Sequence, residues 1–215
     1  MEKIYFDDTT FIWKTKLNLT GFKDEIIRIS KDIIENNTNS PFDAYGYTPK
    51  TKNEIGDIQI NTKLDEVIQI SLDLCKNLYS TERNLQYNRI NFDSWVNLVR
   101  SINPLQLEFK HDELKSISKY HVHTDLNRKM ERFIPQYTFV YYTQMPDVME
   151  GEDGVLYFRG ENKKEYWIRP EEDDLIVMPA DMPHAPNNAP KSTIDRIVLA
   201  GNVGFEFIKK EKSFI

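Results

Sequence analysis

The second half of the chain consists of short apolar segments separated by turn residues, and this rhythm constrains the fold more than any other feature. From residue 95 onward, clusters of Pro, Gly, Asn and Asp interrupt segments of strand length. We expect strands at Trp95–Val99, Leu105–Phe109, Ser118–His123, Tyr137–Thr143, Val155–Phe158, Tyr166–Ile168, Leu175–Met178 and Arg196–Val203. Many short strands with regular turns are typical of a double-stranded β-helix, or jelly roll, in which two sheets enclose a site at one open end.

The first half of the chain instead shows helical periodicity. Apolar residues recur at helical spacing in 24–35 and 65–79, which predicts two amphipathic helices that brace one sheet of the barrel. The stretch between them, 36–50, has the composition of a long surface loop. Helices followed by strands indicate an α+β protein. We therefore expect a helical support region at 1–94 and a double-stranded β-helix core at 95–215, within one structural domain.

Residues of the kind that bind metals stand at the ends of the expected strands. In an extended segment, side chains at i and i+2 share a face, so His123 and Asp125 can hold one ion from one side. Barrel closure would bring His184 to the same ion. Two imidazoles and one carboxylate occupy one face of an octahedral Fe(II) and leave three positions open. Arg196 begins a later strand, and inside a barrel its guanidinium would need an anion.

The stretch from Trp95 to about Phe207 resembles the prolyl-4-hydroxylase-like branch of the 2-oxoglutarate/Fe(II)-dependent dioxygenases, including small enzymes of phages and bacteria. The segments that carry the resemblance are 120–125, YHVHTD; 139–142, FVYY; 151–158, GEDGVLYF; 170–179, PEEDDLIVMP; His184; and 196–200, RIVLA. The resemblance implies that His123, Asp125 and His184 are the catalytic iron ligands. It also implies hydroxylation of an unactivated C–H bond, in a prolyl or other amino-acid side chain, with 2-oxoglutarate and O2 converted to succinate and CO2. Ascorbate is a further candidate cofactor.

The resemblance also assigns residues to the co-substrate. Arg196 would bind the far carboxylate of 2-oxoglutarate through a bidentate fork. Tyr142 matches the tyrosine that shares this carboxylate. Tyr141 and Tyr142 alternate faces of one strand, so only one of them can point into the barrel, and the sequence leaves open which one does. Tyr120 matches a residue that lines the pocket. Asn202 falls at a pocket-wall position.

Other residues receive plainer predictions. His121 shares a face with His123, and we expect it to be a pocket-wall or outer residue rather than a ligand. The acidic run 171–174 is expected to be a solvated turn; many relatives have Gly there, so Asp173-Asp174 predicts a different turn with no loss of ligands. Trp13, Trp95 and Trp167 are expected to pack in the core.

Two alternatives come from other classes of protein. A cupin would use His121, His123, Glu131 and His184 as its metal ligands, in an enzyme independent of 2-oxoglutarate or in a small-molecule binding barrel. That alternative leaves Arg196 without a role. A non-catalytic interaction module would bury a carboxylate and an arginine without an ion or anion, which is costly.

Composition limits the remaining possibilities. The net charge of −6 disfavours a broad nucleic-acid surface. The absence of a long apolar run predicts that the protein does not span a membrane, and the sequence after Met1 lacks the apolar region of a secretory signal, so we expect a cytoplasmic location, the host cytoplasm if a phage encodes it. The single cysteine, Cys75, excludes an intrachain disulfide. The expected partners are 2-oxoglutarate, O2 and an unidentified substrate, either a peptide or a small molecule.

Overall fold

The computed structural model describes residues 1–36, 44–47, 49, 53, 55–82, 86–99, 120–124, 133–161 and 163–206. Its helices are α1 (Lys23–Glu35) and α2 (Lys63–Glu82), with a 3-10 turn at Thr20–Phe22. Its strands are β1 (Glu2–Tyr5), β2 (Phe11–Lys16), β3 (Ala44–Gly46), β4 (Arg89–Val99), β5 (Tyr137–Gln144), β6 (Leu156–Arg159), β7 (Glu165–Ile168), β8 (Asp174–Pro179), β9 (His184–Pro186) and β10 (Arg196–Glu206). None of these helices is both long and apolar enough to cross a bilayer.

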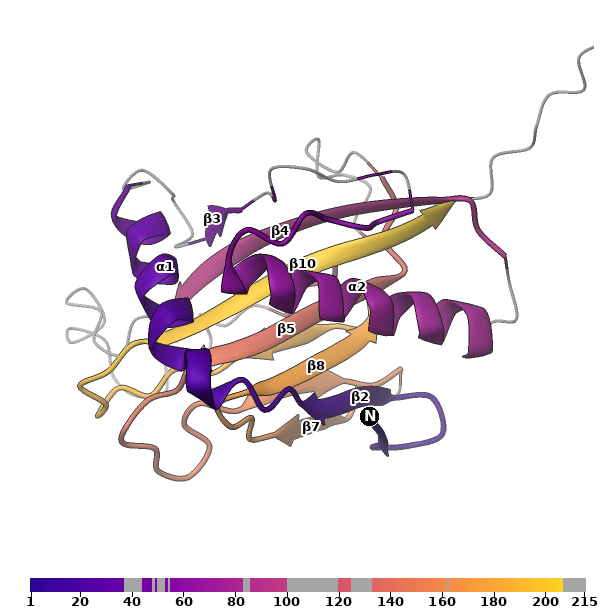
Figure 1. The fold of residues 1–215 in the computed structure, drawn as a ribbon. Coiled ribbons are helices and arrows are strands. Elements are labelled where there is room, and N and C mark those ends of the chain that lie inside the picture. Colours follow the sequence, from indigo (N-terminus) through magenta and orange to yellow (C-terminus); the bar gives the residue numbers. More distant parts are fainter. Residues whose placement is uncertain are drawn as a thin grey trace, which may run out of the picture.

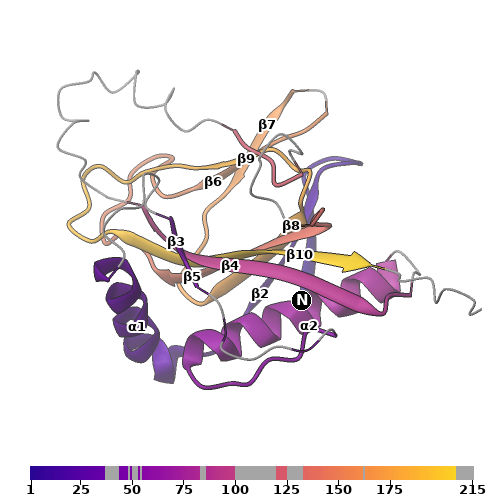
Figure 2. The same cartoon turned by 90° about the horizontal axis from the view of Figure 1, so that it is seen from above.

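Two antiparallel sheets form the core. The larger has the strand order β1-β2-β8-β5-β10-β4-β3, and the smaller has the order β7-β6-β9. Figure 2 shows the smaller sheet on one side of the larger sheet and both helices on the other side. The predicted α+β fold with a double-stranded β-helix core is confirmed. β4 begins at Arg89 rather than at Trp95, and the division of the chain after residue 94 stays a prediction.

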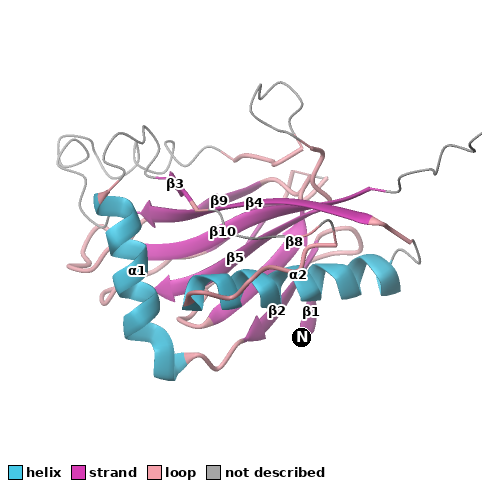
Figure 3. Cartoon of the chain, turned by 45° about the horizontal axis from the view of Figure 1, so that its top comes forward, coloured by secondary structure: helices cyan, strands magenta, loops and turns pink. Residues whose placement is uncertain are grey.

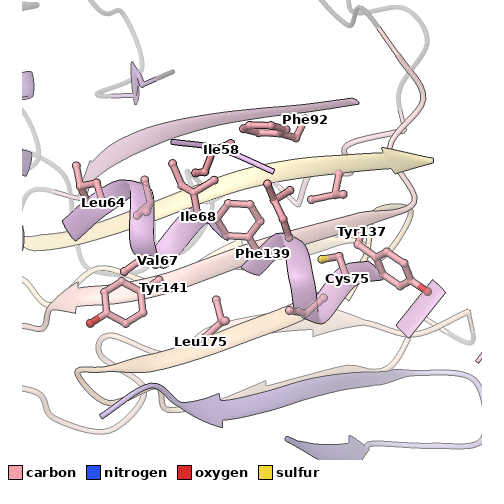
Figure 4. Close-up of a cluster of buried hydrophobic side chains, with 14 of the residues drawn as sticks. Ile58, Leu64, Val67, Ile68, Cys75, Phe92, Tyr137, Phe139, Tyr141 and Leu175 are labelled. Carbon is pink, nitrogen blue, oxygen red and sulfur yellow. The ribbon is translucent and has the colours of Figure 1, made fainter. Parts of the chain in front are cut away.

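The two helices cover the outer face of the larger sheet, as predicted. Figures 1 and 3 show α2 running along the strands and α1 crossing near their ends. The side chains that α2 buries, including Leu64, Val67 and Ile68, pack against Phe139, Tyr141 and Leu175 in Figure 4. Cys75 is fully buried in the same layer. Since each fully buried large apolar side chain contributes about 1.5–3 kcal/mol, this layer is a principal source of stability.

A second apolar cluster fills the space between the two sheets. Val140 and Tyr142 of β5 belong to it, together with Ile176 of β8 and Phe158 of β6. β5 therefore sends alternate side chains to the helices and to the barrel interior, because successive residues of a strand point to opposite faces. Every residue of β5 from Tyr137 to Thr143 is buried, which is why this segment has no polar alternation in the sequence.

The amino-terminal hairpin extends the larger sheet and contacts the smaller one. β2 pairs with β8 from Trp13↔Val177 to Lys16↔Asp174. The ring of Phe6 stacks on Phe158 and Tyr166, and the Tyr166 hydroxyl donates a hydrogen bond of 2.7 Å to the Asp7 carboxylate. The sequence did not predict these strands or β3, which lies within the expected surface loop. β1 and β3 are only four and three residues long, too short for periodicity to identify them.

The acidic run at 171–174 is only in its first half the solvated turn that we expected, because Glu171 is exposed whereas Asp173 and Asp174 are buried. Asp173 is 8% exposed and Asp174 is fully buried. Asp173 adopts a φ of +70°, the left-handed conformation that glycine favours. Its carboxylate accepts hydrogen bonds from the Leu19 backbone N–H at 3.1 and 3.2 Å and from the Tyr141 hydroxyl at 3.0 Å. An aspartate thus holds a turn conformation that suits glycine, and its side chain ties the start of β8 to the helical layer.

Replacing Asp173 with alanine should lower the free energy of unfolding by about 2–4 kcal/mol. The change leaves the Leu19 N–H and the Tyr141 hydroxyl without their acceptor. Alanine also lacks the short polar side chain that allows aspartate and asparagine to tolerate a positive φ. Asp173→Asn is the matched control, because asparagine tolerates this conformation and keeps one acceptor oxygen; its loss should be about 1 kcal/mol. Urea denaturation of both variants measures the difference. Equal stability of the alanine variant and wild type would contradict the assignment.

Candidate metal centre

His184 stands at the start of β9, on the inner side of the smaller sheet. Its Nδ1 lies 2.9 Å from the Met182 carbonyl oxygen. Because a carbonyl can only accept, Nδ1 carries the proton and Nε2 carries the lone pair. Burial, and then the neighbouring His121, lower the pKa of His184 to about 3. His184 is therefore a neutral imidazole whose free nitrogen points away from the backbone that orients it, as a metal ligand requires.

The segment 120–124 is held against β9 by backbone hydrogen bonds. His121 and His184 exchange two N–H···O bonds, each of 3.1 Å, in an antiparallel bridge. The backbone N–H of His123 donates to the Ala180 carbonyl at 2.8 Å. These bonds place two histidines, 61 residues apart in the sequence, on neighbouring segments. Barrel closure therefore brings His123 and His184 together, as predicted.

The two buried histidines direct the same nitrogen toward one point. His123 and His184 are 5% and 4% exposed, and their Nε2 atoms are 3.3 Å apart. Adjacent ligands at right angles on one ion, each about 2.1 Å from it, lie about 3 Å apart. Since Nε2 of His184 carries a lone pair, the pair must share a proton or face a cation. The separation and the donor set fit two neighbouring ligands of a divalent metal.

A third histidine belongs to the same group. The ligand nitrogens of His121, His123 and His184 all lie within 4.8 Å of one another. The His121 ring is half-buried, and its centroid lies 4.3 Å from that of His184. We expected His121 at the pocket wall, and its distance from the other two histidines is short enough for a ligand. Asp125, the predicted carboxylate ligand, and Glu131 lie outside the described residues.

Trp95 contacts the metal centre from the larger sheet. Its ring stacks on His123 with a centroid distance of 5.8 Å and an interplanar angle of 25°. It is partly buried and packs against the apolar cluster between the sheets, as expected, and it also forms a wall of the site. Core packing is also confirmed for Trp13, which is 5% exposed, but it is wrong for Trp167, which is 47% exposed on β7.

Arg196 lies inside the barrel, as predicted, and its guanidinium is buried there. It is 2% exposed, and its Nη1 donates a long hydrogen bond of 3.3 Å to the Gly154 carbonyl. Among the described residues, no hydrogen-bond partner exists for its buried Nε and Nη2. Burial lowers the pKa of Arg196. A buried cation with two unused donors on one side of a planar fork is a site for a carboxylate.

Tyr142 and Tyr141 point to opposite faces of β5. Tyr142 packs in the cluster between the sheets, where burial raises the pKa of its hydroxyl and the nearby Arg196 acts in the opposite direction. Tyr141 packs in the helical layer and donates its hydroxyl hydrogen to Asp173. Only Tyr142 shares the interior with Arg196.

The remaining predicted pocket residues have other neighbours. The Tyr120 ring lies 4.0 Å from the guanidinium carbon of Arg159, and burial followed by the charge of Glu165 raises the pKa of Tyr120 to about 12. These two neighbours belong to β6 and β7. Asn202 is buried on β10, and its side-chain oxygen accepts a hydrogen bond of 3.0 Å from the Thr138 hydroxyl.

Comparisons with known proteins bear on the fold. No family model matches the sequence, and no curated protein matches it. The structure is similar to a Pseudomonas putida prolyl-4-hydroxylase, with a TM-score of 0.55 and 12% identity over 92% of this chain and 93% of that one. A viral collagen prolyl hydroxylase from Paramecium Bursaria Chlorella virus-1, solved with 2-oxoglutarate, gives a TM-score of 0.51 and 16% identity over 93% and 98% of the two chains.

A third similar structure is a prolyl hydroxylase from Trichoplax adhaerens, in complex with a peptide fragment of the hypoxia inducible factor oxygen degradation domain. Its TM-score is 0.51, with 10% identity over 89% of this chain and 82% of that chain. The chain therefore has the fold of the prolyl hydroxylases over nearly its whole length. At identities this low, shared fold does not assign chemistry, so function has to be argued from the side chains of the site.

Proposed function

We propose that this protein is an Fe(II)- and 2-oxoglutarate-dependent dioxygenase that hydroxylates an unactivated C–H bond. The observation that carries the proposal is the buried, incompletely bonded guanidinium of Arg196 in the same barrel as the facing nitrogens of His123 and His184. A metal site alone would suit many reactions. A metal site together with a buried cation suits a co-substrate that has both a chelating end and a far carboxylate, as 2-oxoglutarate has.

The residues divide into a metal-binding set and a carboxylate-binding set. His123 and His184, with Asp125 as the proposed third ligand, would hold Fe(II) and leave positions for the keto-acid end of 2-oxoglutarate and for O2. When bound, iron would supply oxygen activation coupled to conversion of 2-oxoglutarate to succinate and CO2. The protein contributes binding, orientation and exclusion of side reactions. The Met182 carbonyl fixes the His184 tautomer, and Trp95 supports the ring of His123.

Arg196 would bind the far carboxylate of 2-oxoglutarate with its two unused donors, and the Tyr142 hydroxyl would share that carboxylate. Both side chains lie in the barrel interior, where low polarity strengthens a charge-assisted hydrogen bond. Folding already removes Arg196 from water. The carboxylate of 2-oxoglutarate would therefore replace hydrogen bonds to water that the guanidinium loses on burial. The roles of Tyr120 and ascorbate stay predictions.

The prime substrate is proposed only as a class. The similar structures include a collagen prolyl hydroxylase and a prolyl hydroxylase with a bound peptide, which makes a peptidyl proline the first substrate to test here. A free amino acid or another small molecule is the second class to test. Function depends on the residues around the site rather than on the fold.

A cupin-type metal site is the second candidate, because His121 lies within 4.8 Å of both other histidines. A cupin would use all three imidazoles and Glu131. This alternative assigns no task to Arg196, whose buried Nε and Nη2 have no partner within the described part of the chain, an arrangement that costs free energy. It therefore ranks below the dioxygenase.

The first experiment is the anaerobic addition of Fe(II) and 2-oxoglutarate to metal-free protein. We expect the weak visible charge-transfer band of an iron-chelated 2-oxoglutarate, and its loss in His123→Ala. Bound iron without the band would contradict the dioxygenase and favour the cupin-type site. Absence of iron binding would favour a barrel that acts as a binding module.

A further inference from the structure

His121 is closely linked to the candidate metal centre through both its backbone and its ring. Two backbone hydrogen bonds of 3.1 Å join it to His184, so the two residues cannot separate without breaking the bridge. Its ring lies 4.3 Å from that of His184 and 5.1 Å from that of His123. Opposite ligands of one ion, each about 2.1 Å away, lie about 4.2 Å apart. The 4.8 Å limit on the three nitrogens thus leaves His121 within a small side-chain rotation of ligation.

Ligation by His121 would conflict with the proposed reaction if it were permanent. An octahedral ion has six positions, of which the two histidines and the carboxylate fill three. Chelating 2-oxoglutarate needs two more, and O2 needs the last. A permanent third imidazole would leave no position for O2 once 2-oxoglutarate is bound. His121 is also the least buried of the three histidines, so it has more room to move than His123 or His184.

We propose that His121 is an exchangeable metal ligand, which coordinates the ion in the absence of 2-oxoglutarate and leaves it when 2-oxoglutarate chelates. Ligation by His121 is inferred from the geometry of the three histidines. Its departure on binding of 2-oxoglutarate rests on the proposed function. Ligation in the resting protein occupies one of the three positions that the two histidines and the carboxylate leave open. Its departure when 2-oxoglutarate chelates frees the sixth position for O2.

Cu(II) tests the ligation directly, because the hyperfine splitting in its electron paramagnetic resonance spectrum depends on the number of imidazole nitrogens bound. Wild-type protein loaded with one equivalent of Cu(II) should show three nitrogens, and His121→Phe should show two. Phenylalanine keeps a ring against His184, and His121→Leu provides a second variant if the first folds poorly. His111→Phe is the control, since it removes the remaining histidine of the chain and should leave three nitrogens. Two nitrogens in wild type would overturn ligation by His121.

The exchange also predicts the affinity for 2-oxoglutarate. Removing His121 should raise this affinity, whereas removing a residue that only supports the site should lower it. If ligation by His121 and chelation of 2-oxoglutarate exclude one another, as proposed, removing His121 raises the affinity for 2-oxoglutarate, by linkage between the two events. With Fe(II) under anaerobic conditions, His121→Phe should bind 2-oxoglutarate about 5-fold or more tightly than wild type. Adding 2-oxoglutarate to the Cu(II) wild-type protein should reduce three nitrogens to two. Unchanged or weaker binding in the variant would overturn the exchange.

These outcomes separate the exchange from the proposed function. If wild type shows three nitrogens but never develops the iron charge-transfer band, the dioxygenase is contradicted and His121 is a fixed ligand of a cupin-type site. If the band forms while Cu(II) shows only two nitrogens, the dioxygenase stands and His121 is a wall residue.

Discussion

Replacing Arg196 with methionine should weaken 2-oxoglutarate binding by roughly 30- to 5,000-fold, while the unliganded protein stays as stable as wild type or becomes more stable. The loss of affinity corresponds to about 2–5 kcal/mol, the usual effect of truncating one partner of a buried, hydrogen-bonded charge pair. Titration of the charge-transfer band under anaerobic conditions measures it. A large rise in KM with a similar kcat at saturation would accompany it in turnover assays.

The equal or higher stability expected of Arg196→Met follows from the surroundings of the guanidinium. In the unliganded protein Arg196 is 2% exposed, makes one long hydrogen bond to Gly154, and has two buried nitrogens without a partner among the described residues. An unsatisfied buried donor costs about 1–3 kcal/mol, and more when it is charged. Methionine fills much of the same volume without that cost. Thermal unfolding of the metal-free variant should therefore give an equal or higher Tm.

Arg196→Lys is the matched control for the shape of the cation. Lysine keeps the positive charge but offers no planar fork, so its affinity for 2-oxoglutarate should fall between those of wild type and Arg196→Met. A marked fall in Tm together with unchanged 2-oxoglutarate binding in Arg196→Met would make Arg196 a structural cation instead. That result would remove the main support for the dioxygenase.

The sequence predicted those parts of the fold in which side-chain periodicity is strong. Both helices and the strands of the β-helix core that the structure describes carry runs of apolar residues long enough to be recognised. β9 escaped prediction because three residues, beginning with His184, carry no periodic signal. The burial of Asp173 and Asp174 was not predicted either. A run of acidic residues indicates a solvated turn unless its hydrogen-bond partners are known. Leu19 and Tyr141, the partners of Asp173, are distant from it in sequence.

The sequence predicted those parts of the candidate site that consist of histidine or arginine at the ends of expected strands. His123 and His184 converge, and Arg196 is buried in the barrel, as their spacing and strand positions predicted. The approach of His121 was not predictable, because it depends on the antiparallel bridge to His184 rather than on local sequence. The stacking of Trp95 on His123 likewise depends on how the larger sheet faces the smaller one.

Replacing His184 with alanine should abolish the iron–2-oxoglutarate band. His184 supplies a neutral nitrogen whose tautomer is fixed by the Met182 carbonyl, and its Nε2 shares one point with that of His123. Residues that only orient a ligand contribute roughly 10–100-fold to metal affinity, and loss of the ligand itself should exceed that. Equilibrium dialysis of Fe(II) under anaerobic conditions measures the change. His111→Ala should bind iron as wild type does, and near-native thermal unfolding of the metal-free His184→Ala protein would show that the fold is retained.

The carboxylate ligand then separates the two chemistries that share these histidines. Under the dioxygenase, Asp125→Ala should lose the band as completely as His184→Ala, and Glu131→Ala should keep it, because one carboxylate completes the facial set. A cupin-type site would form no band, and its iron binding should be lost in Glu131→Ala and kept in Asp125→Ala. Both residues lie outside the described part of the chain. These variants therefore identify which carboxylate binds the metal together with the histidines. Retention of the band in Asp125→Ala would contradict the proposed iron ligands even if Arg196 behaved as expected.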